Sequence, residues 1–356
     1  MSVSRTEKLR GKVALSPGEG LLVSHEADVR WLTGFSGSNG AVLITGSEVH
    51  IFTDGRYRAQ IANETTDGVI HVDSGGAVQS AAAYAASLGL RELQFQGGNL
   101  SYETVQTLAI DFPDLPCRSS AVLIDRLRST KEAIEIDCIR RALRITERVF
   151  KDCQSAIVDG MSELDLAAEI DYKQRLLGAE KNSFDTIVAF GSRSALPHAR
   201  PGRKKLSRGE PILLDFGCVI DGYASDMTRM IHFGEPAADF LEAYEAVNKA
   251  LTVASENAKA GLTGRELDES ARVVLREANL ESYFSHSLGH GVGLEIHEWP
   301  SVSARNLDRL PSGCVITIEP GVYFDGRFGI RIENMVYLNE GNCTTLNDLA
   351  TNLVVL

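Results

Sequence analysis

The sequence contains no long hydrophobic run and no cluster of basic residues. No apolar stretch approaches the roughly 20 residues that span a bilayer, and the first residues, MSVSRTEKLRGKVAL, hold no apolar segment of the signal-peptide type. Lysine and arginine number 36 against 48 acidic residues, which gives a formal net charge of −12. These absences argue against a membrane or a nucleic acid as the main partner, and we expect a cytoplasmic protein.

Cysteine is scarce as well, and no two cysteines form a C-x-x-C pair. We therefore expect reduced thiols, most of them packed in the interior. The six are Cys117, Cys138, Cys153, Cys218, Cys314 and Cys343. A hydrophobic content of 44% and a charged content of 24% are those of an ordinary globular protein, and 356 residues suggest two domains.

The first part of the chain has the pattern of a small α/β domain. Short β-like runs at residues 21–23, 41–44 and 49–52 are broken by Gly, Ser and Asp. A linker with turn chemistry, DFPDLP, follows at 111–116. We place the domain boundary near residue 125, which divides the chain into residues 1–125 and 126–356.

The second part alternates helices and strands, which predicts an α+β or α/β domain. Ser129 opens a helix, with Glu132 completing its capping box. Thr263 and Glu266 form a second capping box, and Ser162 caps a helix between the two. Strands are predicted at residues 186–190, 212–216, 315–318 and 330–336. The apolar positions of the three helices are Ile139, Ala142, Leu143, Val149, Phe150 and Cys153; Leu164, Ala167, Ile170 and Leu177; and Leu267, Ala271, Val274 and Leu275.

Two segments of this part, DFGCVIDGYASD at 215–226 and EPGVYFDGRFGIRIE at 319–333, share a pattern. In each, an acid follows an apolar strand, Gly comes two positions later and Asp-Gly begins six positions later. Each segment ends on a second acid. The pattern predicts a domain of two similar halves that each contribute two carboxylates. The four are Asp215, Asp226, Glu319 and Glu333.

The first of these segments predicts a hairpin. Asp-Gly between β-like runs is typical of a two-residue type I′ loop. A loop at 221–222 pairs Ile220 with Tyr223 and Gly217 with Asp226. The two acids of the segment then share one face as diagonal neighbours, about 7–8 Å apart, and the glycine leaves the space between them open. A slip of one residue would place them on opposite faces.

A simpler interpretation gives these acids no shared role. Asp215 would cap a turn, and Asp226 would pair with Arg229 at the surface. That interpretation suits a lone aspartate, but it leaves four acids in two matching strand contexts unexplained. A buried carboxylate is costly unless it is paired, hydrogen-bonded or bound to a metal.

A glycine-rich stretch, SHSLGHGVGLEIHEWP at 285–300, holds three of the eight histidines. They are His286, His290 and His297. Position 287 is Ser, so this is not the H-E-x-x-H zinc helix, and no Lys-Ser/Thr follows the glycines as in a P-loop. Three histidines in one such loop indicate a functional site.

Four carboxylates and a histidine form an oxygen-rich donor set. Such a set favours Mn²⁺, Co²⁺ or a pair of Zn²⁺ ions over a structural thiolate zinc site. Four negative charges balance two divalent ions. A pair of such ions activates water and polarises a carbonyl group, which indicates hydrolytic chemistry.

Several motifs resemble one known family. D-F-G…A-S-D-M-T-R, H-S-L-G-H-G-V-G-L-x-x-H-E, T-I-E-P-G-V-Y and G-I-R-I-E-N-M-V occur in the order and spacing of the pita-bread-fold dinuclear metallopeptidases. The match is most similar to the Xaa-Pro branch, aminopeptidase P and prolidase. VRWLTGFSGSNGAVLI and FTDGRYRAQ resemble the creatinase-type N-terminal domain of that branch. The resemblance implies an α+β protein, with a C-terminal pita-bread fold of two pseudo-symmetric halves and a smaller α/β N-terminal domain.

The resemblance also implies the metal ligands. Two divalent ions, Mn²⁺ above all, are expected. Asp226 and Glu333 would bridge them, and Glu319 would also act as general base, passing a proton from water to the leaving proline nitrogen. The five implied ligands are Asp215, Asp226, His290, Glu319 and Glu333.

Further residues match family positions that contact the substrate. His198, in ALPHARP, and His297 would hold the scissile carbonyl and the proline residue. His286 would line the proline pocket, and Arg331 would orient the acidic groups. The resemblance implies proline-containing peptides as substrates and a homodimer as the assembly.

Alternatives stay open within and beyond this branch. Aminopeptidase P accepts longer peptides, and G-F-S-G-S-N-G favours it. Prolidase cuts only dipeptides and needs a cation near the proline carboxylate, for which Arg30, Arg56 and Arg200 are candidates. Methionine aminopeptidases share the fold and ligands but not the long N-terminal domain. Creatinase and the non-catalytic peptide- or histone-binding relatives lack ligands that this chain keeps.

Overall fold

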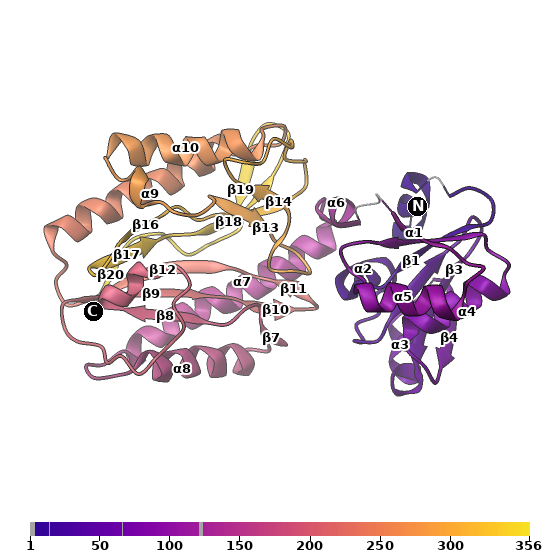
Figure 1. The fold of residues 1–356 in the computed structure, drawn as a ribbon. Coiled ribbons are helices and arrows are strands. Elements are labelled where there is room, and N and C mark those ends of the chain that lie inside the picture. Colours follow the sequence, from indigo (N-terminus) through magenta and orange to yellow (C-terminus); the bar gives the residue numbers. More distant parts are fainter. Residues whose placement is uncertain (1–3, 14, 66, 121–123) are drawn as a thin grey trace. The chain divides into compact units, whose positions relative to one another are not determined.

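The computed structural model describes residues 4–13, 15–65, 67–120 and 124–356. The chain forms two compact units, Met1–Arg128 and Ser129–Leu356. Both mix helices with strands (Figure 1). The predicted boundary, near residue 125, lies inside α6, the short helix that ends the first unit.

The first unit is built on a six-stranded mixed sheet with the strand order β4-β3-β2-β1-β5-β6. Its first three strands are the three predicted β-like runs. Alanine-rich helix α4 packs on this sheet, where Ala81, Ala85 and Phe52 are buried in one core. The elements are α1 Arg5–Lys12, β1 Glu19–Val23, α2 Glu26–Thr33, β2 Ala41–Ile44, β3 Val49–Asp54, η1 Gly55–Tyr57, α3 Arg58–Glu64, β4 Val69–Asp73, α4 Ala77–Ser87, β5 Glu92–Gln96, α5 Tyr102–Asp111, β6 Cys117–Ser120 and α6 Ile124–Arg128.

The second unit repeats one arrangement twice. Each half begins with a long and a shorter helix, of 21 and 14 residues for α7 and α8 and of 20 and 14 residues for α9 and α10. Strands that carry two of the four acids follow in each half. The elements of the first half are α7 Ala133–Cys153, η2 Gln154–Ala156, α8 Glu163–Leu176, β7 Lys181–Asn182, β8 Ile187–Phe190, η3 Gly191–Ala195, β9 Glu210–Phe216, β10 Cys218–Ile220, β11 Tyr223–Ala224 and β12 Met227–Phe233. Those of the second half are α9 Ala238–Asn257, α10 Gly264–Glu277, η4 Glu281–Tyr283, β13 Gly289–Gly291, β14 Glu298–Val302, β15 Val315–Ile318, β16 Gly321–Phe324, β17 Phe328–Arg331, β18 Asn334–Leu338, β19 Cys343–Thr345 and β20 Val354–Val355.

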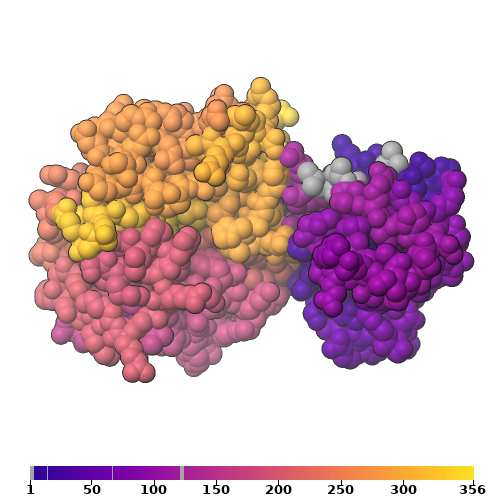
Figure 2. Space-filling view, viewed as in Figure 1, coloured from indigo at the N-terminus to yellow at the C-terminus, as the bar shows by residue number. Residues whose placement is uncertain are grey.

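The helices of the second unit lie outside and its sheets lie between them. Helices α9 and α10 cover one side, and α7 and α8 cover the other (Figure 1). The main sheets have the orders β20-β12-β9-β8 and β14-β13-β15-β18-β19. In the space-filling view the pink first half and the orange to yellow second half of this unit meet along a seam (Figure 2).

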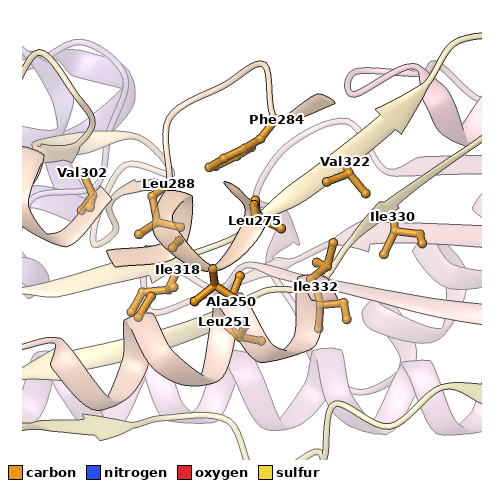
Figure 3. Close-up of a cluster of buried hydrophobic side chains, with 14 of the residues drawn as sticks. Ala250, Leu251, Leu275, Phe284, Leu288, Val302, Ile318, Val322, Ile330 and Ile332 are labelled. Carbon is orange, nitrogen blue, oxygen red and sulfur yellow. The ribbon is translucent and has the colours of Figure 1, made fainter. Parts of the chain in front are cut away.

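The sheets are held to the helices by apolar side chains. Leu251 and Leu275, from α9 and α10, gather with Ile318, Val322 and Ile330 from the strands (Figure 3). All five are buried. A buried leucine or isoleucine contributes about 1.5–3 kcal/mol relative to its exposed state, so this cluster fixes the strands that carry the second pair of acids.

The capping signals in the sequence predict the starts of two helices correctly and the start of a third incorrectly. The capping box of Thr263 and Glu266 is present at α10, and Ser162 caps α8. The predicted start of α7 at Ser129 is wrong: its N-cap is Glu132, which forms a box with Glu135. The residues before Glu132 do not join the helix, because the backbone N–H of Lys131 donates to the carbonyl of Gly313 at 2.8 Å. The six apolar positions predicted along α7 are all buried.

Two further predictions need correction. On α8, Leu164 and Leu177 are exposed, and Leu166 and Gln174 occupy the buried face with Ala167 and Ile170. The predicted strand 330–336 is two strands, β17 and β18, which belong to different sheets. The chain changes sheet between them, at the position of the last acid.

The predicted hairpin of the first half is confirmed. Ile220 lies opposite Tyr223, and both loop residues have positive φ, 48° at Asp221 and 84° at Gly222, as a type I′ turn requires. The same register continues into β9 and β12, where Met227 lies opposite Phe216. Gly217 therefore lies opposite Asp226, and both acids of the segment fall on one face of the ladder.

The cysteines are free, and four of the six are buried, as predicted. Among the residues that the structure describes, none of the helices combines the length and the apolar character needed to cross a membrane.

Gly217 is required by close packing in the hairpin, because a Cβ there would lie 1.8 Å from the carbonyl oxygen of Ser225. We predict that Gly217→Ala lowers the free energy of unfolding by about 1–3 kcal/mol or more, because the two strands must move apart to admit the added methyl group. Gly341→Ala is the matched control, because a Cβ there meets nothing within 4 Å. Chemical denaturation measures both, and equal stability of the two variants would contradict the prediction.

Candidate metal centre

One cavity of about 570 Å³ gathers the predicted metal ligands, histidines and Arg331, and of the three candidate cations Arg200 lines it but Arg30 and Arg56 do not. It is lined by residues of β8, β9, β13, β14 and β17, and by Asp226 and Glu319, which directly precede β12 and directly follow β15. The nine predicted site residues are among those that line it: His198, Asp215, Asp226, His286, His290, His297, Glu319, Arg331 and Glu333. Residues from both halves of the second unit therefore meet at one place, on the seam between them.

The two hairpins present their acids in different ways. In the first half Asp215 lies opposite Thr228, so Asp226 is its diagonal neighbour. In the second half Ile318 lies opposite Asn334, and the same register places Glu319 directly opposite Glu333. The loop of the second hairpin has three residues, 325–327, in place of two. The halves are therefore similar in path but not equivalent in geometry.

Three side chains of the cavity have the arrangement of metal ligands. One potential ligand atom each from Asp226, His290 and Glu333 lie within 4.8 Å of one another. The His290 Nε2 atom is 3.6 Å from Asp226 Oδ2 and 3.5 Å from Glu319 Oε1. A histidine nitrogen among carboxylate oxygens is a donor set that suits a divalent transition metal.

The polar atoms of the acids show that a cation fits here. Among the described residues, the Asp215 Oδ1 and Glu333 Oε1 atoms are buried and accept no hydrogen bond. Burial, and then the charges of neighbouring acids, raise the pKa of Asp226 well above its usual range. Burial and the Asp215 charge raise the pKa of Glu333 to about 8. Unpartnered oxygens and mutual repulsion are both relieved by positive charge.

Arg331 supplies a permanent positive charge to these acids. Its guanidinium forms a buried ion pair with Asp215 and donates to Tyr323 Oη at 2.8 Å and to the Pro197 carbonyl at 3.1 Å. Its Nε donates to Thr228 Oγ1 at 3.1 Å. Burial acts to lower the pKa of Arg331, but its Tyr323 and carboxylate neighbours raise it well above the usual range, so the side chain stays charged.

Glu333 is held by the first half of the unit. Its Oε2 accepts a hydrogen bond from Thr228 Oγ1 at 3.0 Å, and its N–H donates to the Thr228 carbonyl at 3.2 Å. Arg229 also bonds the Glu333 carbonyl, and it donates to Asn334 Oδ1 and to the Leu349 carbonyl at 2.9 Å. The simpler interpretation, a surface pair of Asp226 with Arg229, is wrong: both are buried and Arg229 bonds other groups.

His286 and His290 are neutral in this environment. Burial and the neighbouring His297 lower the pKa of His290 to about 3, and burial and Arg331 lower the pKa of His286 to about 4. The His290 and His297 rings pack edge to face with centroids 4.1 Å apart. A neutral imidazole can bind a metal or accept a hydrogen bond. His198 is exposed and lines the same cavity.

Three residues that hold the site together are not among those predicted from the sequence. Tyr323 lies between His286 and Arg331, with its hydroxyl 2.8 Å from each. Thr228 supports Glu333, and Thr317 contacts both Glu319 and the backbone N–H of His290. Tyr323 stands within T-I-E-P-G-V-Y, two positions after the glycine, which is the one signal that could have indicated it.

Two pseudo-symmetric halves that bring carboxylates and a neutral histidine to one cavity define a metallopeptidase of the pita-bread fold. Comparison with known families agrees. The family described as metallopeptidase family M24 matches residues 137–340, and the creatinase/prolidase N-terminal domain matches residues 5–130. The chain belongs to metallopeptidase family M24, so the predicted family and fold are confirmed.

Similar proteins extend the match to almost the whole chain. The Xaa-Pro dipeptidase of Pyrococcus horikoshii is 34% identical over 337 residues, which cover 94% of each protein. The crystal structure of an X-Pro aminopeptidase from Thermotoga maritima has a TM-score of 0.91 at 35% identity, with 99% of this chain and 100% of the other covered. An Xaa-Pro dipeptidase from Bacillus anthracis has a TM-score of 0.94 at 34% identity, with 99% of both covered.

The raised pKa values predict that metal binding strengthens with pH. Below about pH 8 Glu333 carries a proton in the metal-free site, and a metal must displace it. We expect the apparent Mn²⁺ affinity to rise between pH 6 and pH 8, by up to about tenfold per pH unit for each proton displaced. Isothermal titration in buffers of different ionisation enthalpy measures affinity and proton release together. An affinity independent of pH, without proton release, would contradict the assignment of these acids as ligands.

Proposed function

We propose that this protein hydrolyses the peptide bond that precedes proline, Xaa-Pro, in a metal-dependent reaction. The observation that carries the proposal is the single cavity in which four carboxylates, a neutral His290 and three further histidines converge. Relatives of nearly full length that are named Xaa-Pro dipeptidase and X-Pro aminopeptidase support it. They match both units of the chain, whereas the methionine aminopeptidase alternative has no long N-terminal domain.

The metal ligands in this proposal are the four carboxylates and His290. Two divalent ions, with Mn²⁺ preferred over Co²⁺ or Zn²⁺, would neutralise four negative charges. Asp226 and Glu333, both buried, would hold the ions from the interior of the site. When bound, the ions would supply a strong electrophile for the carbonyl oxygen and lower the pKa of water. Arg331 would keep Asp215 ionised and correctly oriented through their buried ion pair.

Glu319 is the proposed general base. It is the more accessible acid of the second pair, because its side chain is 17% exposed whereas Glu333 is buried. Burial raises the pKa of Glu319 well above its usual range. A carboxylate with a raised pKa is a stronger base, and it would accept a proton from the attacking water and return it to the proline nitrogen. Protonation of that nitrogen lets the C–N bond break.

The histidines would position the substrate. His198 and His297 lie on the cavity wall and would donate hydrogen bonds to the scissile carbonyl and to the proline residue. His286 would line the pocket for the ring, held in place by the Tyr323 hydroxyl at 2.8 Å. An Xaa-Pro bond lacks an N–H and has a restricted φ, so a site that binds the ring and the free α-amine suits it better than strand-like binding.

The location and assembly are also proposals. The acidic composition and the unpaired cysteines support a cytoplasmic protein that acts on proline-containing peptides. A homodimer is expected from the family resemblance. Release of the first residue from longer peptides, as in aminopeptidase P, is our first expectation, and strict dipeptide hydrolysis is the alternative.

Substrate length tests the function directly. We expect the Mn²⁺-loaded protein to hydrolyse Ala-Pro and Ala-Pro-Ala at the Ala-Pro bond, and chelation to abolish both activities. Ala-Ala-Ala is the control, since it lacks the proline ring. Mass spectrometry of the released alanine gives kcat/KM for each peptide. Turnover of neither proline peptide by the metal-loaded protein would overturn the proposal.

The general base is tested by Glu319→Gln. We expect kcat to fall by at least about 100-fold, because the amide cannot accept the proton of water. Exposed Glu340, in the same unit, provides the control Glu340→Gln, which should keep the wild-type rate. Circular dichroism establishes that both variants fold. Retention of more than a tenth of the wild-type kcat in Glu319→Gln would show that another group takes the proton.

A further inference from the structure

Lys131 and Glu298 form a buried ion pair close to the catalytic cavity. Glu298 directly follows His297, which lines the cavity, and Lys131 stands two residues before α7. The Lys131 ammonium group bonds the Glu298 carboxylate, and each side chain is 1% exposed. Removing two charges from water costs about as much free energy as their attraction returns, so a buried ion pair adds little net stability. Stability alone therefore does not account for this pair.

Lys131 connects the two neighbours of the strand that carries His290. In the sheet β14-β13-β15-β18-β19, strand β13 lies between β14 and β15. The backbone N–H of Lys131 donates to the carbonyl of Gly313, two residues before β15. Its side chain bonds Glu298, the first residue of β14. One residue thus fixes the strands on both sides of His290.

Strand β14 is irregular where it passes His290. His290 lies opposite Ser301, but the next residue of β13, Gly291, lies opposite Glu298, so the two residues between these partners have no opposing residue. A bulge of this kind re-aims the side chains beside it. It lies next to both histidines of this sheet, His290 and His297, whose rings pack with centroids 4.1 Å apart. The bulge therefore sets the position of one histidine relative to the other.

The Glu298 carboxylate fits closely into the glycine-rich loop. A Cβ on Gly293 would lie 2.6 Å from Glu298 Oε1 and 2.8 Å from Oε2. A Cβ on Gly291 would lie 2.7 Å from the Glu298 carbonyl oxygen. Because these two positions carry no side chain, the loop closes over Glu298. The ion pair that holds this carboxylate thus also holds the loop that connects His290 to His297.

We propose that the Lys131–Glu298 ion pair positions the two histidines, His290 as a metal ligand and His297 as a substrate contact. Within the described part of the chain, neither member of the pair is among the residues that line the cavity. Both are therefore positioning residues, and they act through the bulge and the loop. This inference rests on the proposed function, because the roles of the histidines come from it.

Three variants separate this role from a purely structural one. Lys131→Met removes the cation of the pair, and we expect its denaturation midpoint to fall because a buried charge loses its partner. Lys131→Met/Glu298→Gln has two uncharged side chains of similar size, and its midpoint should return most of the way to the wild-type value. Val149→Ala is the matched control: it removes buried methyl groups from α7, outside the cavity, and lowers the midpoint by loss of packing.

Mn²⁺ affinity and turnover are then measured where circular dichroism shows every variant to be folded. In the double variant we expect the Kd for Mn²⁺, from isothermal titration, to rise about 10-fold, as when a residue that orients a metal ligand is removed. At saturating Mn²⁺, kcat/KM for Ala-Pro-Ala should also fall about 10-fold, because His297 is displaced as well. Val149→Ala should keep both wild-type values despite its lower midpoint.

A wild-type Kd in the double variant would overturn the role of the pair towards His290. A wild-type kcat/KM at saturating Mn²⁺ would overturn its role towards His297. Equal changes in Val149→Ala would overturn both, since they would follow from lost stability alone. If the wild type hydrolyses no proline peptide, the proposed function fails, and the Kd for Mn²⁺ still decides whether the pair positions His290.

Discussion

The structure of the second unit depends on the repulsion among four carboxylates that share one buried cavity. Four carboxylates in one cavity cannot all stay ionised without a compensating charge, and burial increases the free-energy cost of ionisation. Arg331 compensates in part through its ion pair with Asp215. The buried, unpartnered oxygens of Asp215 and Glu333 show where further positive charge belongs. The fold thus holds together carboxylates that would separate in water. A bound metal ion stabilises that arrangement.

The contacts that oppose this repulsion also join the two halves. Arg331 of the second half bonds Asp215 of the first, and Thr228 of the first half bonds Glu333 of the second. Arg229 adds buried hydrogen bonds across the same seam. The residues that orient the acids are therefore the residues that dock one half on the other. A substitution on this seam alters catalysis and stability together, because it acts on one set of contacts.

The parts of this structure that follow local rules could be predicted from the sequence. The Asp-Gly loop set the hairpin register from Ile220 to Tyr223, and that register aligned the first two acids. The start of α7 could not be predicted, because Lys131 is held by Gly313 and forms a buried pair with Glu298, both distant in sequence.

Long-range contacts also explain what the sequence left undecided in the site. The break between β17 and β18 results from pairing with two different sheets, which the apolar pattern of 330–336 does not reveal. Tyr323 lies in the motif T-I-E-P-G-V-Y, yet its role depends on His286 and Arg331, which only the fold brings close to it. Arg200 is one of three candidate cations in the sequence, and only the folded structure shows that it lies on the cavity wall.

The division of the acids between two hairpins makes the site dependent on contacts between distant parts of the chain. Asp215 and Arg331 are 116 positions apart, so their contact closes a long loop and is of the non-local kind that slows folding. His290, Glu319 and Glu333 all follow the first pair of acids and leave the ribosome after them. A nascent chain that ends before Glu319 has two of the four acids, and one that ends before Glu333 has three. The proposed set of metal ligands is therefore complete only after Glu333 has been synthesised.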